Sequence, residues 1–155
     1  MPEITYKQVE TISEFIDAIR IRVDVFIIEQ KCHPGWEPSE LDKVAEHYIA
    51  IADGEVTATA RLRTDAPGSQ KIESMAVKRD HRGRNVGLGL TRRLVQAAQA
   101  KHAERIWVQA QSHASGFYEK SGFQVISDEY DLFNLGIPHV TMEFRGADQS
   151  GWRHA

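Results

Sequence analysis

A segment rich in glycine and arginine lies between two apolar stretches that differ in periodicity. Residues 72–77 form a short apolar run typical of a buried strand, and the apolar residues after the segment recur at helical spacing: Leu90, Leu94, Ala97 and Ala98. A chain that turns through glycines from a strand into a helix presents unpaired backbone N–H groups and the positive end of the helix dipole. The sequence therefore predicts a phosphate-binding turn over residues 82–90, which its arginines strengthen.

The spacing of these glycines excludes two common phosphate-binding loops. A Walker A loop ends in Gly-Lys-Ser/Thr, whereas Gly87 is followed by Leu88 and Gly89. A dinucleotide-binding fingerprint needs a third glycine where this chain has Arg92. The pattern Arg84-x-x-Gly87-x-Gly89 instead resembles the acyl-CoA loop of the GNAT family of N-acetyltransferases. Taken alone, it also fits a glycine-rich turn with a purely structural role.

A second motif supports this resemblance. Residues 117–123 are similar to the second GNAT signature, an aromatic pair followed by Gly-Phe, and they come after the first motif in the expected order. Residues 25–30 and 136–142 are similar to the ElaA-like and YjcF-like branch of the family. Together these segments span most of residues 20–145, which argues against a chance match.

Composition limits the remaining possibilities. With 155 residues, 41% of them hydrophobic and 26% charged, we expect one globular domain over residues 1–145 and a polar tail over 146–155 that contains Trp152. A formal net charge of −3 argues against nucleic acid as a partner. The first residues do not resemble a signal peptide, no apolar run has membrane-spanning length, and Cys32 is the single cysteine. We therefore expect a cytoplasmic protein without a membrane partner; a homodimer is compatible with this sequence.

The periodicity along the chain predicts a mixed α/β (α+β) sheet. We expect strands at residues 4–9, 48–52, 55–60, 72–77, 105–110, 123–127 and 140–144. Thr11 and Glu14 form a capping box for an amphipathic helix over residues 12–26, and Asp53-Gly54 is a type I′ hairpin signal. After the irregular residues 31–42 and the strands, Ser112 is placed to cap a short helix that ends at Gly122.

The resemblance implies the GNAT acyl-CoA N-acyltransferase fold. In that fold, a mostly antiparallel sheet of about six to seven strands is flanked by helices. Two central parallel strands splay apart, and the pantetheine arm pairs with the strand backbone at a bulge. The implied donor is acetyl-CoA, with no metal. The cofactor-binding residues implied are Met75, Ala76, Val77, Arg82, Gly83, Arg84, Asn85, Val86, Gly87, Leu88, Gly89, Phe117 and Tyr118. We expect Gly87 and Gly89 to lack a Cβ that would obstruct the phosphates.

Acetyl transfer to an amine requires a base for the ammonium group, an N–H donor for the oxyanion and an acid for the thiolate. The resemblance places Tyr118 as the acid and Glu73 as the base, with the Met75 or Val77 N–H as the donor. A tyrosine packed in the core and a solvated strand-edge glutamate are the structural alternatives. A base role for Glu73 requires a raised pKa. Two histidines are alternative bases: His47 and His139.

The acceptor is the least defined part of the prediction. Five acidic residues crowd one segment: Glu29, Glu37, Glu40, Asp42 and Glu46. This segment lines the acceptor side in related folds, which suggests a cationic, polyamine-like amine; a charged, solvated loop is the alternative. We expect a small-molecule amine, or an amine of a peptide or protein, to contact three residues: Glu29, Glu73 and His139.

The sequence thus predicts an acetyl-CoA-dependent N-acetyltransferase that transfers the acetyl group directly within a ternary complex. A non-catalytic acyl-CoA-binding or regulatory module is an alternative. An acyl-homoserine lactone synthase-like acyltransferase is another, although the complete loop favours free CoA.

Overall fold

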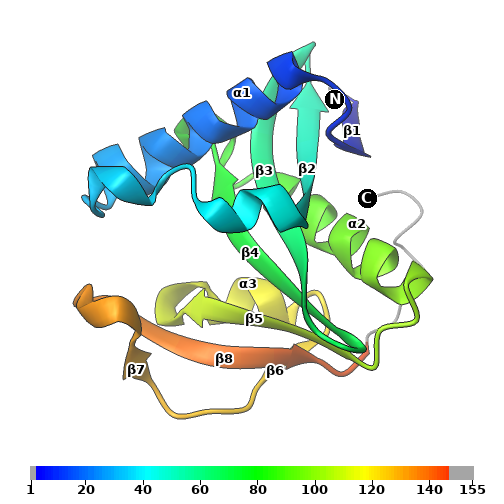
Figure 1. Cartoon of the computed structure of the whole chain (residues 1–155), viewed down its shortest axis with the longest axis vertical. Helices are drawn as coiled ribbons and strands as arrows, with labels where there is room; N and C mark the ends of the chain where they lie inside the picture. The colour runs from blue at the N-terminus through cyan, green and yellow to red at the C-terminus, as the bar shows by residue number, and fades with distance from the viewer. Residues whose placement is uncertain (1–2, 147–155) are drawn as a thin grey trace.

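The computed structural model describes residues 3–146, so the rest of the predicted tail, with Trp152, lies outside the described residues. Within this range one sheet of eight strands runs in the order β1-β2-β3-β4-β5-β8-β6, and β7 pairs with β8 (Figure 1). The strands are β1 (Ile4–Gln8), β2 (Ala45–Ala52), β3 (Glu55–Ala66), β4 (Ser69–Val77), β5 (Arg105–Gln111), β6 (Phe123–Val125), β7 (Tyr130–Asp131) and β8 (Pro138–Phe144). The mixed, mostly antiparallel sheet is as predicted. The exception is β7, which the sequence did not predict because two residues are too few to show a periodic pattern.

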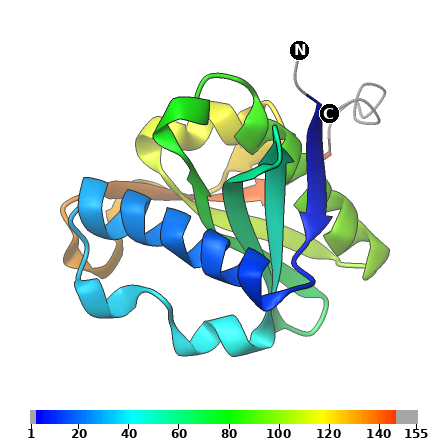
Figure 2. The same cartoon turned by 90° about the horizontal axis from the view of Figure 1, so that it is seen from above.

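Helices cover both faces of this sheet. Figure 2 shows α1 (Ile12–Arg22) on one side, and α2 (Val86–Ala100) with the short α3 (Ser115–Glu119) on the other. Leu90 and Leu94, on the predicted apolar face of α2, are fully buried in one cluster with Ile72 and Val108 of the sheet. The main core therefore lies between α2 and the strands, as the helical spacing predicts.

The first helix begins where the capping box predicts and ends earlier. The Thr11 hydroxyl accepts a hydrogen bond from the Glu14 N–H at 3.1 Å, and the Glu14 carboxylate accepts one from the Thr11 N–H at 3.1 Å. The expected helix to residue 26 is wrong in detail, because a π-helix (Val23–Glu29) replaces the last turns. There the Gln30 N–H donates to the Val25 carbonyl at 3.0 Å. Such widened turns often occur at functional sites.

The predicted hairpin is confirmed. Asp53 and Gly54 have φ of 53° and 76°, and a type I′ turn requires positive φ at both positions. The predicted cap of the short helix is wrong. Ala114 is the N-cap residue of α3. Ser112 is instead the first residue of a 3₁₀ turn (Ser112–Ala114), and its hydroxyl has no hydrogen-bond partner among the described residues. Gly122 has a φ of 93° after this helix, as predicted.

The parallel strands β4 and β5 separate along their length. They pair from Ser69–Arg105 to Ile72–Val108 and no further, although both strands continue (Figure 1). On its other edge β4 contains a bulge, because Thr59 of β3 pairs with Ala76 while Arg61 pairs with Glu73. The bulge leaves Ser74 with a φ of 56°, a left-handed conformation unusual for serine. The predicted splay of the parallel strands is confirmed.

Candidate active site

A cavity of about 510 Å³ occupies the gap between β4 and β5. Its walls are the diverging ends of these strands, the π-helix, α3 and the segment before β8. The structure brings together many of the predicted site residues along these walls: Glu29, Glu73, Met75, Ala76, Val77, Arg82, Phe117, Tyr118 and His139. Beyond Ile72, backbone groups of β4 on the edge that faces β5 have no ladder partner, which suits an extended ligand that carries amides.

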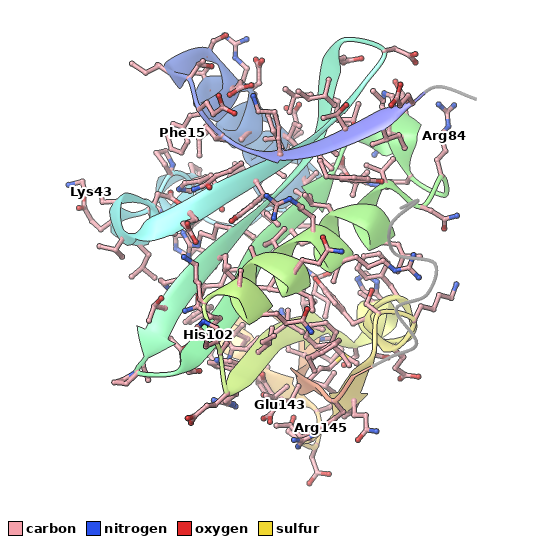
Figure 3. All side chains as sticks on the ribbon, turned by 90° about the vertical axis from the view of Figure 1, so that its right-hand side faces the viewer. Phe15, Lys43, Arg84, His102, Glu143 and Arg145 are labelled. Carbon is pink, nitrogen blue, oxygen red and sulfur yellow. The ribbon has the colours of Figure 1, made fainter. Side chains whose placement is uncertain are left out.

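The predicted phosphate turn adjoins this cavity. Asn85 is the N-cap of α2 with a φ of 61°, and Gly83 has a φ of 78°. The first ladder bond of the helix runs from the Gly89 N–H to the Asn85 carbonyl at 3.1 Å, so the N–H groups that precede it have no helical partner. Arg84 is exposed, and its side chain points away from the molecule at the edge of this turn (Figure 3). These features suit an anion at the helix N-terminus.

The two glycines of the motif have a packing role beyond the one expected. A Cβ on Gly87 would lie 3.1 Å from Cζ of Phe117, and a Cβ on Gly89 would lie 2.1 Å from the hydroxyl oxygen of Tyr6. Both glycines are buried and face these aromatic rings. The missing Cβ atoms thus allow α2 to pack against Phe117 and β1, and the expectation that they also clear space for phosphate stays a prediction.

Arg82 is also placed differently from the prediction that it pairs with phosphate. Its two terminal nitrogens pair with both carboxylate oxygens of Glu29, at 2.9 and 3.0 Å. Its Nε–H donates to the Val77 carbonyl at 3.0 Å. The hydrogen bond from Arg82 lowers the pKa of Glu29. The pair thus connects the π-helix to the end of β4 beside the cavity.

Glu73 does not have the raised pKa that a base role requires. Its carboxylate accepts hydrogen bonds from Arg61 at 3.1 Å and Arg63 at 2.7 Å, and Lys71 lies 3.2 Å away. Burial opposes ionisation, but the hydrogen bond from Arg63 and the positive charges around Glu73 outweigh it and lower its pKa to about 2. A carboxylate held in this way is a weak proton acceptor at neutral pH.

Tyr118 is buried and contributes to the cavity wall. Its ring contacts Phe117 and Phe123 edge to face, with centroids 4.8 and 5.9 Å away. Burial raises the pKa of its phenol, so the proton stays on the oxygen at neutral pH. None of the hydrogen bonds within residues 3–146 uses this hydroxyl, and the phenol can therefore donate to a group in the cavity.

His139 is a buried residue of β8 that also contributes to the cavity wall. Its Nδ1 lies 2.8 Å from the Ile137 carbonyl, and its ring stacks on Tyr130. A carbonyl oxygen only accepts hydrogen bonds, so Nδ1 carries the hydrogen and Nε2 of the neutral ring has a free lone pair. The alternative base, His47, instead lies against Phe15 and the Asp42 carbonyl, away from the cavity.

The acidic segment does not form a free negative surface. Each of its carboxylates contacts a basic side chain: Glu29 contacts Arg82, Glu37 contacts Arg22, Glu40 contacts Lys43, Asp42 contacts Arg22 and Arg61, and Glu46 contacts Lys101. The electrostatic argument for a polyamine-like acceptor therefore loses its basis.

The cavity residues that were not singled out from the sequence include Ser74, Trp36 and Phe133. Ser74 follows from the bulge, which the strand pattern does not reveal. Trp36 and Phe133 lie in loops far apart in the chain, where only an aromatic residue among turn-forming neighbours could have signalled a role.

Residues 2–145 match the family model described as "Acetyltransferase (GNAT) domain". The chain belongs to the GNAT acetyltransferase family. Its relatives include the "Uncharacterized N-acetyltransferase YjcF" of Bacillus subtilis (strain 168), which is 34% identical over 126 residues, or 81% of this chain and 89% of YjcF. Both predicted signatures lie within residues 2–145, and the similarity to YjcF supports the ElaA-like and YjcF-like branch.

Solved bacterial structures share this fold. Escherichia coli ElaA superposes with a TM-score of 0.79 at 23% identity, covering 94% of this chain and all of ElaA (100%). An acyl-CoA N-acyltransferase from Pseudomonas aeruginosa superposes with a TM-score of 0.73 at 26% identity, covering 93% and 99% of the two chains. Membership of the GNAT family supports an acyltransferase that uses an acyl-CoA donor.

Residues 3–146 contain neither a metal-binding cluster nor a helix suited to span a membrane. In this range there is no cluster of three or more His, Cys, Asp or Glu side chains suited to a metal ion. No helix of the same range combines the length and apolar character needed to cross a bilayer.

Proposed function

We propose that this GNAT protein is an acetyl-CoA-dependent N-acetyltransferase that transfers the acetyl group directly to a primary amine in a ternary complex. The observation that carries the proposal is the end of β4–β5 pairing at Ile72–Val108, with the cavity directly beyond it. A cavity open between two strands allows a donor and an acceptor to meet within one site. An acetyl-CoA donor and a single cysteine are consistent with a cytoplasmic protein.

In this proposal, CoA extends from the turn before α2 into the gap. The pyrophosphate binds the free N–H groups at the start of α2, and Arg84 adds a positive charge there. The pantetheine amides pair with the unpaired edge of β4 at Met75, Ala76 and Val77. In this orientation the thioester would lie toward Tyr118, and the Met75 or Val77 N–H would stabilise the oxyanion.

We assign the acid role to Tyr118 and the base role to Nε2 of His139, in place of Glu73. His139 takes a proton from the acceptor ammonium group and later releases it to solvent. The neutral amine forms the C–N bond with the thioester carbon, the C–S bond breaks, and the thiolate takes the phenolic proton of Tyr118. The proton lost by the new amide nitrogen returns to the Tyr118 oxygen, so the net reaction releases one proton.

The first test is a thiol-release assay with acetyl-CoA across a broad amine library. The expected result is turnover with at least one amine. Tight CoA binding without thiol release from any amine would favour a non-catalytic acyl-CoA-binding module instead.

Calorimetric titration of CoA tests the position of the phosphates. Arg84→Glu reverses an exposed charge at the α2 N-terminus and should raise the Kd for CoA about tenfold or more, because it places a carboxylate beside the pyrophosphate. The matched control is Arg20→Glu, which makes the same charge change on an exposed side chain of α1. Equal effects of the two variants would contradict the proposed placement.

A further inference from the structure

Two aromatic side chains from distant segments meet at the cavity. Trp36 belongs to a 3₁₀ turn (Pro34–Trp36) and Phe133 to another (Leu132–Asn134), and both contribute to the cavity wall. Their rings contact edge to face with centroids 5.7 Å apart. Three apolar side chains extend this wall: Phe26, Leu132 and Leu135. This part of the cavity can thus receive an apolar group.

Both members of the aromatic pair are exposed, and the backbone of Phe133 is strained, in a way that the fold alone does not explain. Trp36 is 40% exposed and Phe133 is 70% exposed, although both are large and apolar. Phe133 and Asn134 also have consecutive left-handed φ values of 59° and 57°, which is unfavourable for a bulky residue such as Phe133. An exposed aromatic residue held in a strained conformation beside a cavity is typical of a ligand contact.

The charges in the cavity limit how many positive groups the acceptor carries. Both carboxylate oxygens of Glu29 pair with Arg82, and both oxygens of Glu73 are held by basic side chains. The third cavity carboxylate, Glu37, is 9% exposed and accepts a hydrogen bond from Arg22 on Oε2. Within the described residues, Oε1 of Glu37 is the carboxylate oxygen of this wall that has no such partner. Oε1 of Glu37 can accept a hydrogen bond from one cationic group of the acceptor, and a second such group would find no similar carboxylate oxygen among the described residues of this wall.

We propose that the acceptor is a primary amine with a single positive charge and an aromatic group, whose ring packs on Trp36 and Phe133. This inference rests on the proposed acetyltransferase function. Stacking or edge-to-face contact of the acceptor ring with Trp36 and Phe133 adds to the stabilisation from burial of its apolar area. A flexible diamine of similar length gains neither the ring contact nor a second ion pair.

The test compares three primary amines: 2-phenylethylamine, butylamine and 1,4-diaminobutane. With the native protein, kcat/KM should be highest for 2-phenylethylamine, because its ring can pack on Trp36 and Phe133. We expect about tenfold over butylamine, which corresponds to about 1.4 kcal/mol of additional binding. Trp36→Ala and Phe133→Ala should each raise KM for 2-phenylethylamine several-fold. Both variants should lower kcat/KM much less for butylamine than for 2-phenylethylamine, because butylamine has no ring to contact Trp36 and Phe133.

Two control variants separate a specific contact from general damage. Trp36→Phe keeps an aromatic face and should retain most of the preference for 2-phenylethylamine. Ile12→Ala removes an exposed apolar side chain on α1 and should leave all three amines unaffected. Equal losses for all amines in Trp36→Ala and Phe133→Ala, or 1,4-diaminobutane as the best substrate, would overturn the inference alone. Absence of thiol release with every amine would instead contradict the proposed function.

Discussion

At the scale of single residues, the surroundings decide which groups can move protons. Glu73 has the position expected of a base, yet basic side chains on β3 and β4 hold it as a carboxylate of low pKa. Tyr118 has the opposite environment, because burial raises the pKa of its phenol and keeps it protonated. His139 has its tautomer set by a single carbonyl. Residue type and position alone would not separate these three cases.

Tyr118→Phe tests the acid at this scale. The ring still fills its site among Phe117 and Phe123, but no proton is available for the departing thiolate. We expect kcat to fall by about 10²–10⁴-fold with little change in KM for acetyl-CoA. Steady-state rates with the best amine from the library provide the measurement. A rate within twofold of the native protein would restrict Tyr118 to packing.

His139→Ala tests the base by chemical rescue. The substitution removes the lone pair of Nε2, and we expect kcat to fall by about 10²-fold or more. Added imidazole can enter the space left by the side chain and should restore part of the rate. His47→Ala is the control, because that ring lies outside the cavity and added imidazole should bring no recovery there. Loss of activity in His139→Ala without any rescue would argue for a purely structural histidine.

At the scale of elements, a buried ion network holds the acceptor-side loops on the sheet. Asp42, in a 3₁₀ turn (Glu40–Val44), accepts hydrogen bonds from Arg22 of α1 at 2.9 Å and from Arg61 of β3 at 2.8 Å. Arg61 also reaches Glu73 of β4. One carboxylate thus links a helix, a loop and the sheet beneath the cavity.

Asp42→Asn should destabilise the fold strongly, because it neutralises the carboxylate that two buried guanidinium groups share and leaves Arg22 paired only with Glu37 and Arg61 only with Glu73. We expect the free energy of unfolding in urea to fall by about 3–5 kcal/mol. Glu40→Gln makes the same chemical change in the same turn, but on an exposed pair with Lys43, and should have little effect. Similar stability of the two variants would show that the network contributes little.

The same carboxylate gives the native protein a pH dependence of stability. Burial opposes ionisation of Asp42, but its hydrogen bonds to Arg22, Ser39 and Arg61 outweigh this and lower the pKa from the usual 3.8 to about 2. The stabilisation is therefore complete above pH 4 and is lost as the pH falls through 2. Urea unfolding across this window should show that loss in the native protein and a smaller one in Asp42→Asn.

At the scale of the whole molecule, the sheet consists of two parts joined at β4 and β5. The described pairing between these strands is limited to four register pairs, from Ser69–Arg105 to Ile72–Val108. Strands β1–β4 lie on one side of this junction, and β5–β8 on the other (Figure 1). A ligand in the gap would hold the two parts together.

CoA should therefore slow amide hydrogen exchange most strongly in the part of β4 that does not pair with β5. At 100 times its Kd, CoA adds about 2.7 kcal/mol to global stability. Beyond this uniform effect, amides of residues 75–77 should gain specific protection, whereas those of the β1–β2 pair should not. Hydrogen exchange measured by mass spectrometry makes this comparison. Uniform protection without an excess at residues 75–77 would contradict pantetheine pairing with β4.

The sequence predicts local structure and the order of elements well, and contacts between distant segments poorly. The Thr11–Glu14 box and the Asp53-Gly54 turn depend on neighbouring residues, and both are confirmed. The pairing of Arg82 with Glu29 depends on two residues brought together by the fold, so no local pattern reveals it. The low pKa of Glu73 likewise depends on a partner strand whose register had to be known first.

The packing of Gly87 and Gly89 against aromatic rings has an evolutionary consequence. A descendant that lost catalysis would still need small residues at both positions, because larger ones would push α2 away from Phe117 and Tyr6. Purifying selection for folding would then preserve the motif in a pseudoenzyme. Genome surveys that recognise acetyltransferases by these glycines alone will therefore include inactive homologues, and the groups that move protons are the better markers.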